Sequence, residues 1–183
     1  MNFSDLVASR ASVRKYTDQP VPDELVMQLL EWAHDAPSGG NLRPWEFILI
    51  ESAGQKQAVV ETTFAGRDES KSNPQKWILT APLVIAVCAD LAKIKGRYGE
   101  TSIWPHLPYL DCSAAVENIL LGAVELGLAS CYVSGFHEQE LSAVLGLPED
   151  VVPIALLPIG YAAESPARRP RGPVAEQIHR ERY

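Results

Sequence analysis

P-L-V-I-A-V-C-A, residues 82–89, is a continuous apolar run near the middle of the chain. Runs of this kind are typical of β-strands that other elements cover on both faces. Two further segments are strand-like, namely residues 45–51 (W-E-F-I-L-I-E) and 152–161 (V-P-I-A-L-L-P-I-G-Y), and residues 129–136 (A-S-C-Y-V-S-G-F) are expected to be a strand that leads into a glycine turn. We therefore expect residues 82–89 to form a core strand.

Helical patterns alternate with these strands, which predicts an α/β or α+β sheet. Helices are expected over residues 3–9 with Ser4 as N-cap, between Pro22 and Pro37, over 55–64, from Pro74 onward, over 110–127 and over 138–145. Small residues in the 110–127 helix permit close approach of another helix, either in the core or at a subunit interface. Residues 90–108 are expected to be irregular.

Asn73 is the expected cap of the helix that begins at Pro74, and Lys76 would lie in the first turn of that helix. The helix dipole disfavours a cation there. A nearby anion or electron-rich ligand would therefore explain Lys76.

The composition is that of a globular protein of 183 residues, long enough for one domain with a real core. The formal charge of −7 argues against a general binding surface for nucleic acid or anionic membrane. The sequence has no apolar run of membrane-spanning length and no N-terminal signal pattern. A soluble, cytoplasmic protein is the expectation.

The three cysteines, Cys88, Cys112 and Cys131, are odd in number and widely spaced, so buried free thiols are expected. None of the four histidines is paired at i, i+4 or lies near a cysteine in sequence, so no metal site is expected.

R-A-S-V-R-K-Y, residues 10–16, places three cations and a hydroxyl within seven residues. In an extended segment Arg10, Ser12 and Arg14 project to one side, where guanidinium groups can bind a phosphate bidentately. Taken alone, the heptapeptide is more typical of a solvated basic turn than of a binding site. The acidic background of the chain favours a local anion site.

A-P-S-G-G-N-L-R-P-W, residues 36–45, predicts a binding loop. Its Gly39–Gly40 pair allows backbone amides to approach a ligand closely. An ordinary turn between a helix and a strand is the alternative, but the loop is longer than such a connection needs.

The sequence contains no dinucleotide-binding glycine motif, no P-loop and no nucleophile elbow. Five segments in order resemble instead the nitroreductase-like superfamily of FMN-dependent oxidoreductases. They are residues 10–16, residues 36–45, N-P-Q-K at 73–76, G-L-A-S-C-Y-V-S-G-F at 127–136, and P-I-G-Y-A-A-E-S-P with R-P-R within 158–171.

This resemblance implies an α+β fold, a three-layer-like sandwich with a central, mostly antiparallel mixed sheet flanked by helices. It also implies a domain-embracing, obligate homodimer with FMN at the interface. Residues 1–183 would form a single FMN-binding domain, in which residues 162–183 are a C-terminal arm that packs on the partner subunit.

The resemblance also implies roles for individual residues. Arg10 and Ser12 would hold the FMN phosphate together with Arg169 and Arg171 from the tail. Arg14 would lie nearer the ribityl chain and the N1 edge of the flavin.

The remaining implied contacts come from three short segments. The loop of the other subunit would cover the flavin ring through Pro37, Ser38, Gly39 and Asn41. The pyrimidine edge would meet Asn73 and Lys76, and N5 would face the backbone of Ser134 and Gly135. A cation beside N1 would also raise the flavin potential, by about 30 mV for each 1.4 kcal/mol of preferential stabilisation.

The implied activity is ping-pong reduction of nitroaromatics, quinones or similar small electron-poor acceptors, with NADH or NADPH as donor and hydride transfer through flavin N5. Alternatives are a relative that uses reduced FMN for dehalogenation, flavin fragmentation or dehydrogenation of peptide-derived rings, and a flavin-binding store or sensor without turnover. A basic-tail interaction module is a third class. No catalytic side chain is nominated, and His106 is the histidine to substitute first if a proton donor is needed.

Overall fold

The computed structural model describes residues 1–67, 69, 73–99, 105–166 and 170–183. Its elements, in chain order, are α1 (Phe3–Ser9), α2 (Asp23–His34), η1 (Gly39–Asn41), β1 (Trp45–Ile50), α3 (Ala53–Glu61), η2 (Lys76–Thr80), β2 (Leu83–Asp90), α4 (Leu91–Tyr98), α5 (Leu107–Glu125), β3 (Ala129–Ser130), α6 (Glu138–Leu145), β4 (Val151–Gly160) and η3 (Val174–Gln177). Within these described ranges, no helix has the length and apolar character needed to cross a membrane.

The four strands form one sheet in the order β1-β2-β4-β3, and every neighbouring pair of these strands is antiparallel. β2 lies inside the sheet, and its residues from Leu83 to Ala89 are all buried, which confirms the expected core strand. A mixed sheet was expected, but among the described residues the one parallel pairing is an isolated bridge between Ser12 and Ser130. The sheet is therefore an open antiparallel one.

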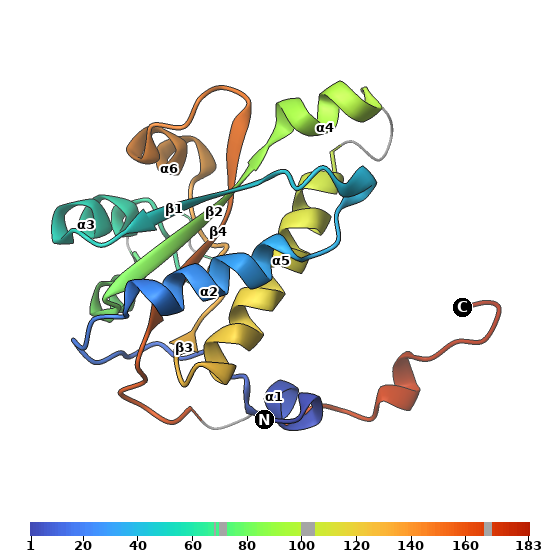
Figure 1. Ribbon diagram of the computed structural model, residues 1–183, viewed down its shortest axis with the longest axis horizontal. Coiled ribbons are helices and arrows are strands. Elements are labelled where there is room, and N and C mark those ends of the chain that lie inside the picture. The colour runs from blue at the N-terminus through green and yellow to red at the C-terminus, as the bar shows by residue number, and fades with distance from the viewer. Residues whose placement is uncertain (68, 70–72, 100–104, 167–169) are drawn as a thin grey trace.

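Helices cover both faces of this sheet (Figure 1). Side chains of a strand alternate between its faces. Accordingly, Leu83, Ile85 and Val87 of β2 join the apolar cluster with α2 and α5, while the intervening Val84, Ala86 and Cys88 join the cluster with α3, η2 and α6. This layered arrangement confirms the α+β architecture.

The small residues of α5 serve a contact within this chain. A Cβ atom at Gly122 would lie 2.5 Å from Cε3 of Trp32 on α2, so the two helices meet where α5 has no side chain. The amide Nδ2 of Asn118 on α5 also donates to the carbonyl oxygen of Trp32 at 2.7 Å. The glycine of the predicted small-residue face is thus explained by packing in the core.

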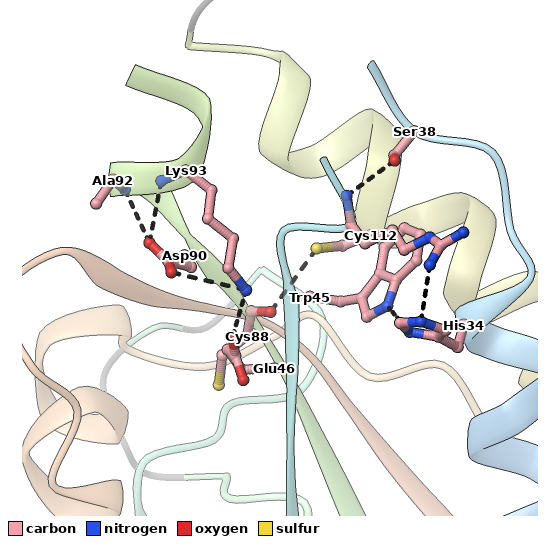
Figure 2. A network of polar contacts seen from close by, with 10 residues as sticks. His34, Ser38, Trp45, Glu46, Cys88, Asp90, Ala92, Lys93 and Cys112 are labelled. Atoms are coloured by element: carbon pink, nitrogen blue, oxygen red, sulfur yellow. Dashed lines mark hydrogen bonds and ion pairs between the residues drawn. The ribbon is translucent and has the colours of Figure 1, made fainter. Parts of the chain in front are cut away.

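Three local predictions were wrong. Asn2, and not Ser4, caps α1, because its side chain accepts from the backbone N–H of Asp5. Residues 91–98 form α4 where an irregular stretch was expected. Oδ1 of Asp90 caps this helix by accepting from the backbone N–H groups of Ala92 and Lys93 (Figure 2).

The third correction concerns Asn73, which caps no helix. The segment after it forms the short 3₁₀-helix η2, which begins at Lys76 and has Gln75 at its N-cap position. The carbonyl oxygen of Asn73 accepts instead from the backbone N–H of Ala65. Lys76 therefore does not lie in the first turn of an α-helix, and no helix dipole there calls for a ligand beside it.

Candidate functional site

The basic segment 10–16 is extended, as predicted, and lies along the edge of the sheet. Ser12 bridges Ser130, and the backbone N–H of Val13 donates to the carbonyl oxygen of Ser130 at 3.0 Å. Val13 and Tyr16 are buried, whereas Arg14 is exposed. The segment is therefore a fixed strand-like edge and not a solvated turn.

Arg10, Ser12 and Arg14 all influence the pKa of one buried thiol, that of Cys131. Burial raises the pKa of Cys131, while Arg14, a hydrogen bond from Ser12 and Arg10 each act in the opposite direction. Groups that influence the same thiol must lie close to it. The predicted projection of these three side chains to one side is consistent with this arrangement.

The start of the tail returns to this segment. Tyr16 bridges Ala162, and the backbone N–H of Ala163 donates to the carbonyl oxygen of Lys15 at 2.9 Å. The backbone N–H of Arg14 donates to Oε1 of Glu164 at 2.6 Å. The C-terminal segment therefore leaves the body of the protein beside Arg14.

A groove of about 600 Å³ opens next to Arg14. Three predicted site residues line it, namely Arg14, Ser134 and Gly135. Other residues that line it have no role in the sequence-based prediction, and the largest side chains among them are those of Phe64, Gln75, Trp77 and Tyr132. Gln75 lies within the N-P-Q-K motif, so the motif indicated the segment but not the residue that faces the groove.

The described residues of the groove combine aromatic walls with the cation of Arg14. The guanidinium carbon of Arg14 lies 5.8 Å from the centroid of the Trp77 ring, within the range of a cation–π contact. Phe64 and Tyr132 contribute further aromatic surface. Such a groove suits a planar aromatic ligand that carries negative charge.

Close backbone packing shapes one wall of the groove. A Cβ atom at Gly135 would lie 2.6 Å from the carbonyl oxygen of Phe64, and the backbone N–H of Phe64 donates to the carbonyl oxygen of Gly135 at 3.0 Å. Only glycine fits position 135 without moving Phe64. The turn that follows β3 is thereby fixed against the end of α3.

Asn73 and Lys76 flank Gln75 in sequence but are not among the residues that line this groove. Both are exposed. The structure thus brings their segment to the groove through Gln75 and leaves the two predicted side chains at the surface.

The loop with Pro37, Ser38, Gly39 and Asn41 lies elsewhere, beside α4 and the start of α5 (Figure 1). Oδ1 of Asp111 accepts from the backbone N–H of Gly39 at 3.0 Å. Gly40 and Asn41 have φ angles of 56° and 57°, a left-handed conformation that Gly and Asn adopt most readily. None of these loop residues lines the Arg14 groove of the same chain.

The exit of this loop is held by a histidine–tryptophan contact. Nε1 of Trp45 donates to Nδ1 of His34 at 3.4 Å, and the two rings meet edge to face (Figure 2). Ser38 accepts from the backbone N–H of Arg43 at 3.0 Å. His34 is therefore a structural residue in this fold.

Only one of the two predicted tail arginines, Arg171, is among the described residues. Arg169 lies outside the described residues, and Arg171 is exposed. In Figure 1 the described end of the tail runs away from the body of the protein. No residue from 170 to 183 is buried in this chain.

Cys88, Cys112 and Cys131 are buried free thiols, as predicted. Burial raises the pKa of Cys88 and of Cys112 to about 12 each, so these thiols stay protonated and unreactive at neutral pH. Among the described residues, no group of histidine, cysteine and carboxylate side chains is arranged to hold a metal ion.

Comparison with known proteins places this geometry in context. Residues 7–161 match the model of the Nitroreductase family. The chain is 31% identical over 175 residues to a putative NADH dehydrogenase/NAD(P)H nitroreductase from Methanothermobacter thermautotrophicus, a match that covers 92% of this chain and 82% of the relative. It is 29% identical over 188 residues to the FMN reductase (NAD(P)H) of Bacillus subtilis, with 94% and 70% of the two chains covered.

A solved structure shows the same fold. The crystal structure of a nitroreductase family protein from Clostridium difficile 630 superposes with a TM-score of 0.81 at 30% identity, and the match covers 100% of both chains.

Proposed function

The chain belongs to the nitroreductase family of oxidoreductases, and on this premise we propose that it is an FMN-dependent NAD(P)H oxidoreductase. Its acceptors would be nitroaromatics, quinones or similar electron-poor small molecules. Two copies of the chain would be needed to complete each site.

The observation that carries the proposal is the groove beside Arg14. Trp77, Phe64 and Tyr132 offer aromatic surface to a planar ring, and Arg14 offers a positive charge. The residues present fit an isoalloxazine with a phosphorylated side chain, because such a ligand combines a planar ring system with anionic groups.

FMN bound at this site would supply the two-electron chemistry, in which hydride passes from NADH or NADPH to flavin N5 and from there to the acceptor in a ping-pong cycle. The chain binds and orients the cofactor and the two substrates. The backbone of Ser134 and Gly135 would face N5, and Asn73 and Lys76 would reach the pyrimidine edge from either side of Gln75.

The phosphate would be held by Arg10 and Ser12, together with Arg169 and Arg171 of the tail. The course of the backbone supports this, because the tail leaves the body beside Arg14. Each charge-assisted hydrogen bond to phosphate contributes about 1.5–3 kcal/mol. Three arginines could therefore supply much of an affinity in the micromolar range or better, which corresponds to about 8 kcal/mol.

A second copy of the chain would bring Pro37, Ser38, Gly39 and Asn41 to the cofactor, because the loop that carries them lies away from the groove of its own chain. The surface of α1 supports such an assembly. None of its residues is buried, and Phe3 and Val7 are 72% and 42% exposed. A partner that covers α1 would remove this apolar surface from water.

The test begins with the absorption spectrum of the purified protein. A yellow preparation that releases FMN on denaturation supports the cofactor assignment. Anaerobic stopped-flow mixing with NADH or NADPH should then bleach the flavin absorbance, and a nitroaromatic or quinone should restore it. If neither nicotinamide bleaches the flavin, the protein is a flavin store or sensor and the proposed activity is wrong.

Two variants connect this test to the groove. Combined replacement Arg10→Ala and Arg14→Ala should yield colourless protein. Lys15→Ala is the matched control, because Lys15 is exposed and lies between the buried Tyr16 and Arg14 on the same segment. Retention of stoichiometric FMN by the double variant would refute the assignment of these arginines.

A further inference from the structure

Gln75 joins three separate segments of the chain at the wall of the groove. Its Nε2 atom donates to the carbonyl oxygen of Phe64 at 2.9 Å and to that of Gly135 at 3.2 Å. Its backbone N–H donates to Oγ1 of Thr63 at 2.9 Å. The end of α3, the start of η2 and the turn after β3 are thus tied together by one residue.

The carboxamide of Gln75 suits this contact. Two carbonyl oxygens accept from its one nitrogen, and the amide nitrogen of glutamine carries two N–H donors without a charge. A carboxylate of the same shape would place negative charge against both oxygens. A side chain without donors would leave the carbonyl of Phe64 without the hydrogen bond that Gln75 supplies.

Gln75 itself is held in place. The hydroxyl of Thr63, which accepts from the backbone N–H of Gln75, is buried and donates to the carbonyl oxygen of Val60 at 2.6 Å. The side chain of Gln75 therefore starts from a fixed backbone position. A residue anchored in this way can determine the position of its partners.

The partner that matters is the turn containing Ser134 and Gly135. Gly135 has backbone contact with Phe64 on one side, and its carbonyl oxygen accepts from both the Phe64 N–H and the Gln75 amide. Because the carbonyl is fixed from two directions, the peptide plane that follows it has little freedom. These hydrogen bonds hold the Gly135 side of the groove wall in a structure that contains no ligand.

We propose that Gln75 is a positioning residue of the flavin site: its carboxamide fixes the Ser134–Gly135 turn against Phe64 and so determines how the backbone of this turn meets the isoalloxazine. The inference deepens the proposed function and rests on it. It assigns to Gln75 a role that acts through Gly135, and not a direct step in hydride transfer.

The first test needs no cofactor. Hydrogen exchange of the FMN-free protein should show that Gln75→Met speeds exchange in peptides covering residues 133–136 at least several-fold, while peptides of α5 remain unchanged. Gln139→Met is the matched control, since Gln139 is exposed in the first turn of α6. Equal exchange at residues 133–136 in wild type and Gln75→Met would overturn the proposal.

The second test measures the bound cofactor. Gln75→Met should weaken FMN binding at least about tenfold, which corresponds to about 1.4 kcal/mol, and should shift the visible spectrum and the reduction potential of the FMN that remains bound. Gln139→Met should change none of these quantities. An unchanged affinity, spectrum and potential in Gln75→Met would refute the role of Gln75 while leaving the proposed function intact. Failure of the wild type itself to bind FMN would refute the proposed function instead.

A third variant keeps the test decisive if Gln75→Met folds poorly. Gln75→Glu preserves the shape, and its protonated form can donate to one carbonyl. Its FMN affinity relative to wild type should therefore rise as the pH falls. Among the described residues, Arg14 lines the same groove, Lys76 follows Gln75 and His137 packs against Phe64. These groups are common to both proteins, so the ratio isolates the new carboxyl group. A ratio that is constant with pH contradicts the proposal.

Discussion

Oδ1 of Asp111 on α5 accepts a hydrogen bond from the backbone N–H of Gly39 at 3.0 Å, across 72 residues of sequence. Asp111 is only 6% exposed, and its Oδ2 atom has no hydrogen-bond partner within the described part of the chain. Burial raises the pKa of this carboxyl, and the hydrogen bond from Gly39 acts in the opposite direction. One carboxylate thus holds the glycine loop in place, and its burial destabilises its charged form.

Replacement of Asp111 by Asn should reveal this cost as a pH dependence. A carboxyl whose pKa is higher in the folded than in the unfolded protein destabilises the fold as the pH rises through the window above 3.8. Asp111→Asn keeps an acceptor for Gly39 but cannot ionise. The free energy of unfolding of Asp111→Asn minus that of wild type should therefore increase from pH 4 to pH 8, because the wild type alone loses stability as its carboxyl ionises. Urea denaturation at each pH measures this difference.

Asp111→Ala separates the hydrogen bond from the charge. It removes the acceptor of the Gly39 N–H and should be less stable than Asp111→Asn by about 1 kcal/mol or more. Equal stability of the two variants at every pH would show that the contact with Gly39 contributes nothing.

Gly122 should not tolerate a methyl group. A Cβ atom there would lie 2.5 Å from Cε3 of Trp32, so Gly122→Ala should lower the free energy of unfolding by about 1–3 kcal/mol through overpacking. The matched control is Gly96→Ala in α4, where the new Cβ would meet nothing within 4 Å. That substitution should stabilise by about 0.5–1 kcal/mol because alanine is the better helix former. Denaturation midpoints of both variants test the contrast, and equal effects would contradict it.

Most of the layered fold could be predicted because it depends on local patterns. The apolar run 82–89 predicts β2, and α6 has the predicted bounds of residues 138–145. Helix α4 was missed because its buried surface is small, with Ile94 as its one buried residue. Asp90 was the available signal, since a carboxylate directly before a helix is a typical N-cap.

The candidate site was predicted only in part, for a physical reason. Motifs identify segments, but the side chain that faces a groove depends on how the backbone turns. The turn into η2 directs Gln75 of the N-P-Q-K motif toward Gly135, a contact that the motif itself does not reveal. Phe64 and Trp77 likewise reach the groove through tertiary packing, which no spacing in the sequence reveals.

Lys56 should make stability depend on pH in the alkaline range. Its ammonium group donates to the carbonyl oxygens of Ala81 and Pro82 at 2.9 and 3.2 Å, and burial lowers its pKa. A lowered pKa means that the fold disfavours the charged form of Lys56. The free energy of unfolding should therefore increase as the pH rises toward 10.5, because the folded protein loses this proton before the unfolded chain does. Lys56→Met should lack that improvement in denaturation curves between pH 8 and pH 10.5.

Lys93→Met serves as the reference for Lys56. The ion pair of Lys93 with Glu46 is short, at 2.7 Å, but both side chains are at least 40% exposed. Its loss should cost under about 1 kcal/mol, whereas Lys56→Met leaves two backbone carbonyls without their donor and should cost about 1–3 kcal/mol at pH 7. The reverse order of the two variants would contradict the role of Lys56.

The tail provides the sharpest test of the assembled site. If residues 162–183 form an arm on a partner subunit, removal of residues 167–183 should leave each chain folded, because residues 170–183 contain no buried side chain. FMN binding and dimer formation should both weaken, as measured by flavin fluorescence and sedimentation. The truncation retains Glu164 and with it the hydrogen bond to the backbone of Arg14. A truncated protein that keeps its dimer and its FMN but loses a macromolecular ligand would identify the tail as an interaction module.

Point variants distinguish specific phosphate contacts from the general charge of the tail. Combined Arg169→Ala and Arg171→Ala removes two proposed charge-assisted bonds and should weaken FMN binding by a factor on the order of 100 or more. Combined Arg180→Ala and Arg182→Ala removes the same charge from exposed positions of the same tail and should change the affinity less than about twofold, since separated exposed charges are screened by salt. Equal losses in the two pairs would show that the tail acts only through its net charge. Arg169 and Arg171 would then not bind the phosphate, whether or not the tail contributes to the dimer.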